Sequence, residues 1–344
     1  MPRPFELGIP FLGERGKWNA ITDVPGLQVG YTTLIEGSSV RTGVTAILPR
    51  GESTEPCYAA IDVLNGNGEM TGSHWINESG FLDGPVLTTN THSVGVVRDA
   101  VIAWQKERHR YPATNRYGDS FFSLPVIAET ADMGLNDMNG FHVRPEHVFA
   151  ALDSASSGPI AEGNVGGGTG MKCHGWKGGT GTSSRVVGDY HVGVLVQANH
   201  GASSRLTIAG IPIGQTLRPD NLPTLIPEGT GSIIVILATD APLFPHQVRR
   251  LARRISLGIG RVGGLGENSS GDIFLAFSTA PAPVTPLDNQ ALNPFFAAAV
   301  DGTEEAIINV LFAAETMTGR DGLTIPRLPQ AEVLGILRRH GRLT

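Results

Sequence analysis

Residues 231–243 read GSIIVILATDAPL and carry the strongest structural signal in the chain. From Ser232 to Asp240 the residues are almost all apolar and mostly β-branched, and the run has the length of a strand buried on both faces. We therefore expect a rigid central strand whose first residue is Ser232.

The residues after this run predict a helix and a second buried strand. Pro245 stands where a first helical turn begins, and Gly258 and Gly260 mark the expected end. The helix has an apolar stripe and an opposite face that we interpret as solvated, with arginines at positions 249, 250, 253 and 254. A second apolar run, DIFLAFST, covers residues 272–279. Strand, helix and strand should form one packed unit.

The remaining sequence alternates expected strands and helices around one glycine-rich segment. Strands are predicted within 26–35, 41–51, 84–95 and 185–201, and helices within 100–110, 145–152, 294–316 and 330–339. Residues 162–184 are rich in glycine and predict a loop that feeds a hairpin. Residues 202–231 contain four prolines and predict an irregular, exposed connection in which a processing site could lie. The last 60 residues should form an outer layer.

The composition is that of a soluble globular protein. Of 344 residues, 40% are hydrophobic and 17% are charged, and the 45 glycines suggest many close backbone approaches. A net charge of -6 argues against nucleic-acid binding. No stretch reaches the roughly 20 apolar residues of a membrane span, and the N-terminus lacks the apolar core of a signal peptide. We expect a cytoplasmic protein.

Familiar cofactor and catalytic motifs are missing from the sequence. Cys57 and Cys173 have neither CxxC nor paired Cys/His spacing, so neither a disulfide scaffold nor a zinc site is indicated. The glycine-rich segment contains no GxxxxGK[ST], and the chain contains no GxSxG, HExxH or EF-hand pattern. We expect no metal and no organic cofactor.

The Gly231–Ser232 junction offers a different chemistry. If this bond is cut, Ser232 becomes an N-terminal residue, and its α-amine, with a pKa of about 7.7–8.0, can accept the proton of its own hydroxyl. Gly231 supplies the permissive backbone that attack of the serine on the preceding carbonyl requires. The alternative is that Gly231 and Ser232 simply begin a buried strand.

A resemblance to a known family favours the catalytic interpretation. The chain resembles the self-processing serine aminopeptidases of family S58, which include the L-aminopeptidase D-amidase/D-esterases and the β-peptidyl aminopeptidases; nylon-oligomer hydrolases are more distant. The resemblance runs through most of the chain in nine ordered blocks: RTGVTAILPRG (41–51), NGNGEMTG (65–72), LTTNTHSVG (87–95), PVIAET (125–130), LNDMNGFHV (135–143), KGGTGTSSR (177–185), LVQANHG (195–201), GSIIVILATDAPL (231–243) and SSGDIFLAF (269–277).

The resemblance implies a fold and an assembly. It implies a four-layer α/β/β/α sandwich with two mainly antiparallel sheets, forming one structural domain. It also implies autocleavage into an α chain of residues 1–231 and a β chain of residues 232–344. Relatives assemble as homo-oligomers of αβ units, so we expect the same here.

The resemblance also assigns catalytic roles. Ser232 corresponds to the nucleophile, and its α-amine would be the base. Asn199 corresponds to an asparagine of the oxyanion hole, although it could be only a turn residue at a strand end. Ser270 and Asp272 correspond to a polar pair that orients the hydroxyl and amine of the nucleophile. Lys177 corresponds to a lysine near the processing site, with a structural ion pair as the alternative.

Substrate recognition is assigned to a second group of residues. Glu129 is our candidate for the acid that pairs with the free amine of the substrate. Asn65 and Asn67 are candidates for the pocket wall, although Asn-Gly pairs are also good turn formers. In the better-known aminopeptidase of the family, a tyrosine follows the Glu-Thr pair. This chain has Ala131 at that position, so the pocket should differ in shape.

The implied activity is hydrolysis of an N-terminal residue from short peptides, amides or esters through a seryl acyl-enzyme. Two alternatives remain at this point. One is acyl transfer of the ornithine acetyltransferase type, which normally uses a threonine nucleophile. The other is an unprocessed, non-catalytic binding protein.

Overall fold

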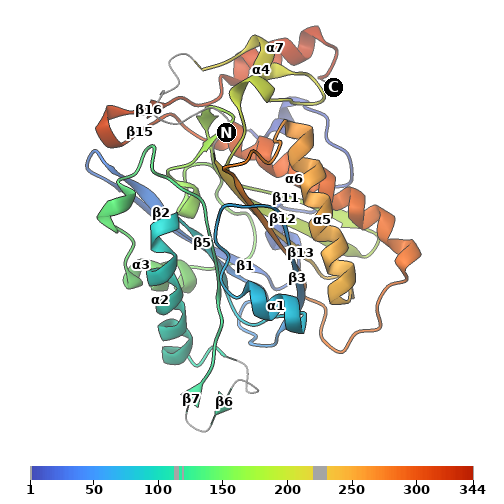
Figure 1. Cartoon of the computed structure of the whole chain (residues 1–344). Coiled ribbons are helices and arrows are strands. Elements are labelled where there is room, and N and C mark those ends of the chain that lie inside the picture. The colour runs from blue at the N-terminus through green and yellow to red at the C-terminus, as the bar shows by residue number, and fades with distance from the viewer. Residues whose placement is uncertain (1, 112–115, 118–119, 220–230, 344) are drawn as a thin grey trace.

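The computed structural model describes residues 2–111, 116–117, 120–219 and 231–343. Two β-sheets lie face to face, and helices cover the outer face of each, as Figure 1 shows. This arrangement is the predicted four-layer α/β/β/α sandwich. Within the described part of the chain, no helix is long and apolar enough to cross a bilayer.

The two sheets are mainly antiparallel, and each contains one parallel pair, β5–β8 and β13–β14. The first sheet has the order β1 (Gln28–Glu36), β2 (Val40–Leu48), β5 (Val86–Thr89) and β8 (Val126–Glu129). The second has the order β11 (Gly179–Val187), β12 (Tyr190–Asn199), β13 (Ser232–Thr239), β14 (Gly271–Ser278), β3 (Cys57–Gly66) and β4 (Phe81–Leu82). Three two-residue hairpins are β6 (Arg116–Tyr117) with β7 (Ser120–Phe121), β9 (Lys172–Cys173) with β10 (Trp176–Lys177), and β15 (Met317–Thr318) with β16 (Thr324–Ile325).

Two pairs of helices form the outer layers. Helices α2 (Val94–Glu107) and α3 (Pro145–Asp153) pack on the first sheet. Helices α5 (Pro245–Val262) and α6 (Asn293–Ala313) pack on the second sheet and on each other. The remaining helices are α1 (Ser73–Ser79), α4 (Ile213–Thr216) and α7 (Gln330–Arg339), with short 3-10 turns between elements.

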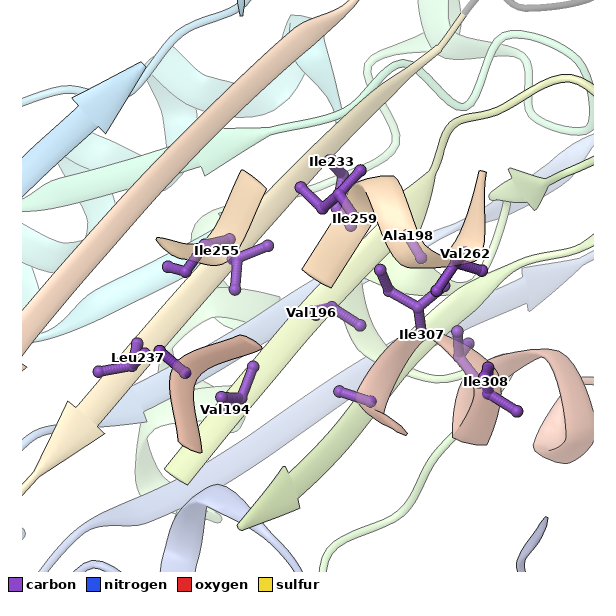
Figure 2. Packing of buried hydrophobic residues seen from close by; sticks show 14 of the residues in the cluster. Val194, Val196, Ala198, Ile233, Leu237, Ile255, Ile259, Val262, Ile307 and Ile308 are labelled. Carbon is purple, nitrogen blue, oxygen red and sulfur yellow. The ribbon is translucent and has the colours of Figure 1, made fainter. Parts of the chain in front are cut away.

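Strand β13 is buried on both faces, as its sequence predicts. Ile233, Val235 and Leu237 join the core beneath α5 and α6, whereas the residues between them join the core between the two sheets. Figure 2 shows Ile233 and Leu237 among side chains of β12, α5 and α6. Because side chains alternate along a strand, Ser232 lies on the side of Ile234, towards the space between the sheets.

The glycine-rich segment was predicted as a loop up to residue 184, and this prediction was wrong in its second half. Strand β11 already begins at Gly179, whereas Gly166–Gly168 form a 3-10 turn wedged between the sheets. A Cβ on Gly167 would lie 2.2 Å from Gln197 Oε1, and one on Gly179 would lie 2.1 Å from the Gly163 carbonyl oxygen. The glycines are therefore required by close packing. A high glycine content is also typical of loops, so composition alone does not distinguish the two cases.

Two boundaries also differ from the predictions. Helix α5 continues through Gly258 and Gly260 and ends at Val262, where Gly263 caps it with a φ of 101°. Gly258 is needed because α6 passes close by, and a Cβ there would lie 2.7 Å from Thr303 Cβ. The predicted irregular connection contains short helical turns at Ser203–Arg205 and in α4, and its residues 220–230 lie outside the described part of the chain.

Candidate active site

Strand β13 begins at the wall of an open cavity of about 750 Å³. The cavity brings together most of the predicted site residues, which come from four separate segments of the chain. They are Asn67, Glu129, Ala131, Asn199, Gly231 and Ser232. Ser232 is only 7% exposed, so a substrate that reaches its hydroxyl must enter the cavity.

The hydroxyl of Ser232 has a fixed partner. The backbone N–H of Gly271 donates a hydrogen bond of 3.1 Å to Ser232 Oγ, because parallel pairing sets Ser232 opposite Gly271. A Cβ on Gly271 would lie 2.5 Å from the Asn67 carbonyl oxygen, so only glycine allows this close approach. Sequence reasoning missed this contact, since a backbone donor leaves no side-chain signal.

Gly231 has a conformation that only glycine adopts easily. Its φ is 153°, and a Cβ would lie 1.9 Å from the carbonyl oxygen of Asn199. Because real Cβ contacts essentially never fall below 3.0 Å, no other residue fits without displacing the chain at the junction. Gly231 therefore directly precedes the strand, in a backbone geometry tied to Asn199.

Asn199 is the direct neighbour of Ser232 in the sheet. The two residues are paired in the β12–β13 register. Asn199 Oδ1 accepts the Lys172 N–H at 2.9 Å, and Nδ2 donates to the Ala131 carbonyl oxygen at 3.0 Å. These bonds fix the side-chain amide at both ends, and an amide nitrogen carries two donors, so it can serve a second acceptor in the cavity.

Ser270 and Asp272 form the expected pair, although their contacts differ from the prediction. Ser270 Oγ donates to Asp272 Oδ1 at 2.6 Å, and both side chains are buried. Burial raises the pKa of Asp272, while bonds from Ser270 and from the Ile233 backbone oppose that rise. The pair thus holds Ile233, the residue after Ser232, whereas the contact to the Ser232 hydroxyl comes from Gly271.

Glu129 presents a buried carboxylate at the cavity wall. It ends β8, is 3% exposed, and accepts the Glu69 N–H at 3.0 Å and the Thr91 hydroxyl. Burial is the main cause of its raised pKa, and the two hydrogen bonds act in the opposite direction. A desolvated carboxylate in a cavity gains most from a cationic partner, which fits the ammonium group of a substrate.

Ala131 contributes through its backbone. Its carbonyl oxygen holds the Asn199 amide, and this contact needs no particular side chain. The small side chain lines the cavity and leaves space that a larger residue would fill. Ala131 therefore keeps the contact to Asn199 and leaves its part of the cavity open.

Besides Ser270 and Asp272, two more predicted residues are not part of the cavity wall. Lys177 is fully buried in β10, where Nζ donates to the carbonyl oxygens of Met171 and Gly178 at 2.9 and 3.0 Å. Burial lowers its pKa to about 7. Asn65 donates to the Glu267 carbonyl oxygen at 2.5 Å and holds the turn before β14. Among the described residues, neither Lys177 nor Asn65 lines the cavity.

One predicted residue has a second role, and the structure adds further residues that the sequence did not indicate. Asn67 lines the cavity but is tied to the Ser269 carbonyl oxygen at 2.7 Å, so it acts as a turn clamp as well as a wall. Lys172, five residues before Lys177, lines the cavity next to Asn199. Apolar wall residues come from two segments far apart in the sequence, one with Met133, Leu135 and Met138 and the other with Ile325.

Comparison with known proteins gives a consistent result. The profile of peptidase family S58 matches residues 19–325. The chain is 51% identical to the β-peptidyl aminopeptidase BapA of Sphingosinicella microcystinivorans, with 99% of this chain and 93% of that protein covered. The L-aminopeptidase D-Ala-esterase/amidase of Ochrobactrum anthropi, a variant of the Ntn hydrolase fold, superimposes with a TM-score of 0.93 at 48% identity over the full length of both chains. A Burkholderia sp. β-aminopeptidase follows with a TM-score of 0.89 and 46% identity over 99% of both chains.

Proposed function

Because the chain belongs to peptidase family S58 and is a serine aminopeptidase with the Ntn hydrolase fold, we propose that it activates itself by cutting the Gly231–Ser232 bond. The observation that carries this proposal is the position of Ser232. It opens a central strand at a cavity wall, directly after a glycine that no other residue can replace.

The cleavage is an intramolecular acyl transfer. Ser232 Oγ attacks the carbonyl carbon of Gly231 and loses its proton, and the C–N bond of the junction breaks. The serine nitrogen takes up a proton and becomes a free amine, while Gly231 is held as an ester on Oγ. Water then hydrolyses the ester and leaves chains of residues 1–231 and 232–344.

The new amine and hydroxyl then act on substrates. The neutral α-amine of Ser232 accepts the hydroxyl proton as Oγ attacks the substrate carbonyl. The Asn199 amide, adjacent to Ser232 in the sheet, donates to the developing oxyanion. The leaving amine or alcohol takes the proton, and water hydrolyses the acyl-enzyme.

Glu129 selects substrates with a free amino group. Its carboxylate lines the same cavity as Ser232 and is almost completely shielded from solvent. An ammonium group bound there sets the first residue of a short peptide, amide or ester at the nucleophile. The enzyme should therefore release single N-terminal residues and reject N-acylated substrates.

Intact-protein mass spectrometry of wild type and Ser232→Ala tests the self-activation. In the wild type we expect two fragments, residues 1–231 and residues 232–344. In the variant we expect one uncut chain. An uncut wild type that still hydrolyses aminoacyl-p-nitroanilides would refute the N-terminal-nucleophile mechanism. An uncut and inactive wild type would instead favour a binding protein.

The proposed product is an αβ unit that assembles into homo-oligomers in the cytoplasm. The two free, buried cysteines are compatible with a reducing compartment. Size-exclusion chromatography with light scattering checks the assembly, and a mass equal to one αβ unit would contradict it.

A further inference from the structure

Three side chains with metal-binding atoms meet next to the active-site cavity. Cys173 ends β9, His174 follows it, and His200 follows directly after β12. One ligand atom of each lies within 4.8 Å of the other two, and all three residues are buried. The backbone joins the two segments, since the His174 N–H donates to the His200 carbonyl oxygen at 2.8 Å.

The spacing of the cluster is close to that of ligands on one metal ion. Cys173 Sγ lies 3.8 Å from His200 Nδ1, and the two imidazole rings are nearly perpendicular, with centroids 5.2 Å apart. Metal–sulfur and metal–nitrogen bonds of about 2.3 and 2.0 Å place two ligand atoms about 3.5 Å apart. Small rotations of the side chains would therefore bring the three atoms around one ion.

The tautomer of His174 is fixed in a ligand form. Its Nδ1 lies 3.0 Å from the Ala202 carbonyl oxygen. A carbonyl can only accept, so Nδ1 carries the proton and Nε2 carries a lone pair. Histidine ligands of metals usually donate the other ring N–H to a carboxylate, a backbone carbonyl or water. Gly201 packs against the ring so closely that a Cβ would lie 2.3 Å from Cε1, which limits the ring to small rotations.

Two nitrogens in the cluster are buried without a partner. Among the described residues, no hydrogen bond reaches Nε2 of His174 or Nε2 of His200, although these residues are 0% and 3% exposed. An unpaired buried polar atom destabilises the folded protein, because it has lost its hydrogen bonds to water. For His174 Nε2, a metal ion would remove this cost.

We propose that Cys173, His174 and His200 form a binding site for a soft metal ion, with Cu⁺ preferred to Zn²⁺. A thiolate with imidazoles suits both ions. On binding, the Cys173 S–H bond releases its proton to solvent and a sulfur–metal bond forms, without a change of oxidation state. One thiolate neutralises Cu⁺ completely but leaves a positive charge on Zn²⁺. Lys172 and Lys177 already act electrostatically on Cys173, so an additional buried positive charge is disfavoured.

The site adjoins the catalytic residues but does not depend on them. Lys172 and Asn199 line the cavity, and each directly precedes a part of the cluster in the sequence. The Lys172 N–H also bonds Asn199 Oδ1. A bound ion would therefore link the segment that contains Asn199 to the segment that holds its side chain. Metal binding requires neither Ser232 nor cleavage of the chain.

The test is a metal titration of the purified full-length protein. Cu⁺ is added without oxygen in competition with bicinchoninate, and Zn²⁺ in competition with a chromogenic chelator. We expect one tightly bound Cu⁺ in the wild type, in Ser232→Ala and in the matched control Cys57→Ser, whose thiol is also buried but bonds Arg50. In Cys173→Ser we expect Cu⁺ affinity to fall by about 100-fold or more.

Three results would overturn the proposal: no Cu⁺ binding by the wild type, unchanged binding by Cys173→Ser, or tighter binding of Zn²⁺ than of Cu⁺. If Cys173→Ser does not fold, X-ray absorption of the copper-loaded wild type decides. One sulfur and two nitrogen ligands support the site, whereas a spectrum without sulfur refutes it. Because Ser232→Ala is included, failure of self-cleavage and failure of metal binding are separate outcomes.

Discussion

Replacing Gly231 by alanine should block self-cleavage while leaving the fold intact. The new Cβ would lie 1.9 Å from the Asn199 carbonyl oxygen, and contacts below 3.0 Å essentially never occur. The junction must therefore shift by about 1 Å, and the φ of 153° adds strain. A misplacement of about 1 Å at reacting atoms can cost about 100-fold in rate, so we expect processing to slow by at least that factor.

The assay follows freshly synthesised precursor by intact mass over time. Gly260→Ala is the matched control, because Gly260 lies on the exposed face of α5 with nothing within 4 Å of a new Cβ. This control should process at the wild-type rate and gain about 0.5–1 kcal/mol in stability. If Gly231→Ala is cleaved as fast as wild type, the steric reasoning at the junction is wrong.

Two further predictions concern the cavity, and a third concerns Asp132, a buried residue between the cavity residues Ala131 and Met133. Asn199→Ala should lower kcat by about 100- to 1000-fold, because the oxyanion loses its side-chain donor. Steady-state kinetics checks this, with a thermal melt as the control for folding. An unchanged kcat would contradict the proposed role of Asn199. Glu129→Gln should lower kcat/KM for free-amine substrates by at least about 30-fold. It should also abolish the fall of kcat/KM on the acid side, which the raised pKa of Glu129 causes. The control is Glu69→Gln at an exposed neighbour, which keeps the backbone N–H that bonds Glu129 and should retain activity. Burial raises the pKa of Asp132 to about 7, above its unfolded value. The wild type should therefore lose stability as pH rises from about 4 to 7, by about 4 kcal/mol at most. In urea titrations, Asp132→Asn should show a flatter curve of stability against pH, and parallel curves for the two proteins would refute this.

The fold was largely predictable because its central elements carry unambiguous patterns. Strand β13 and the following helix and strand are apolar on the faces that they bury, and no other element type accommodates that run at that length. Strand β3 was not predicted, since its second half is partly exposed and its sequence ends in polar turn residues. Its position in the second sheet depends on pairing with β14, which is a tertiary contact.

The candidate site was predictable where a side chain acts and less so where the backbone acts. Ser232, Asn199 and Glu129 come together at one cavity as the family resemblance implied. The Gly271 N–H was missed because its role comes from register and not from residue type. Lys177 was assigned to catalysis, yet its ammonium group bonds carbonyl oxygens of its own hairpin. The sequence motif does not show on which side of the hairpin the Lys177 side chain lies.

The sheet explains how a cut chain could keep its nucleophile in place. Strand β13 lies between β12 and β14, and β12 belongs to residues 1–231 whereas β14 belongs to residues 232–344. After cleavage, the backbone of Ser232 would still be paired with Asn199 on one side and with Gly271 on the other. Breaking one covalent bond at the strand end would therefore free an amine without freeing the strand. The same register that places Ser232 beside Asn199 would then hold the proposed N-terminus next to the Asn199 side chain.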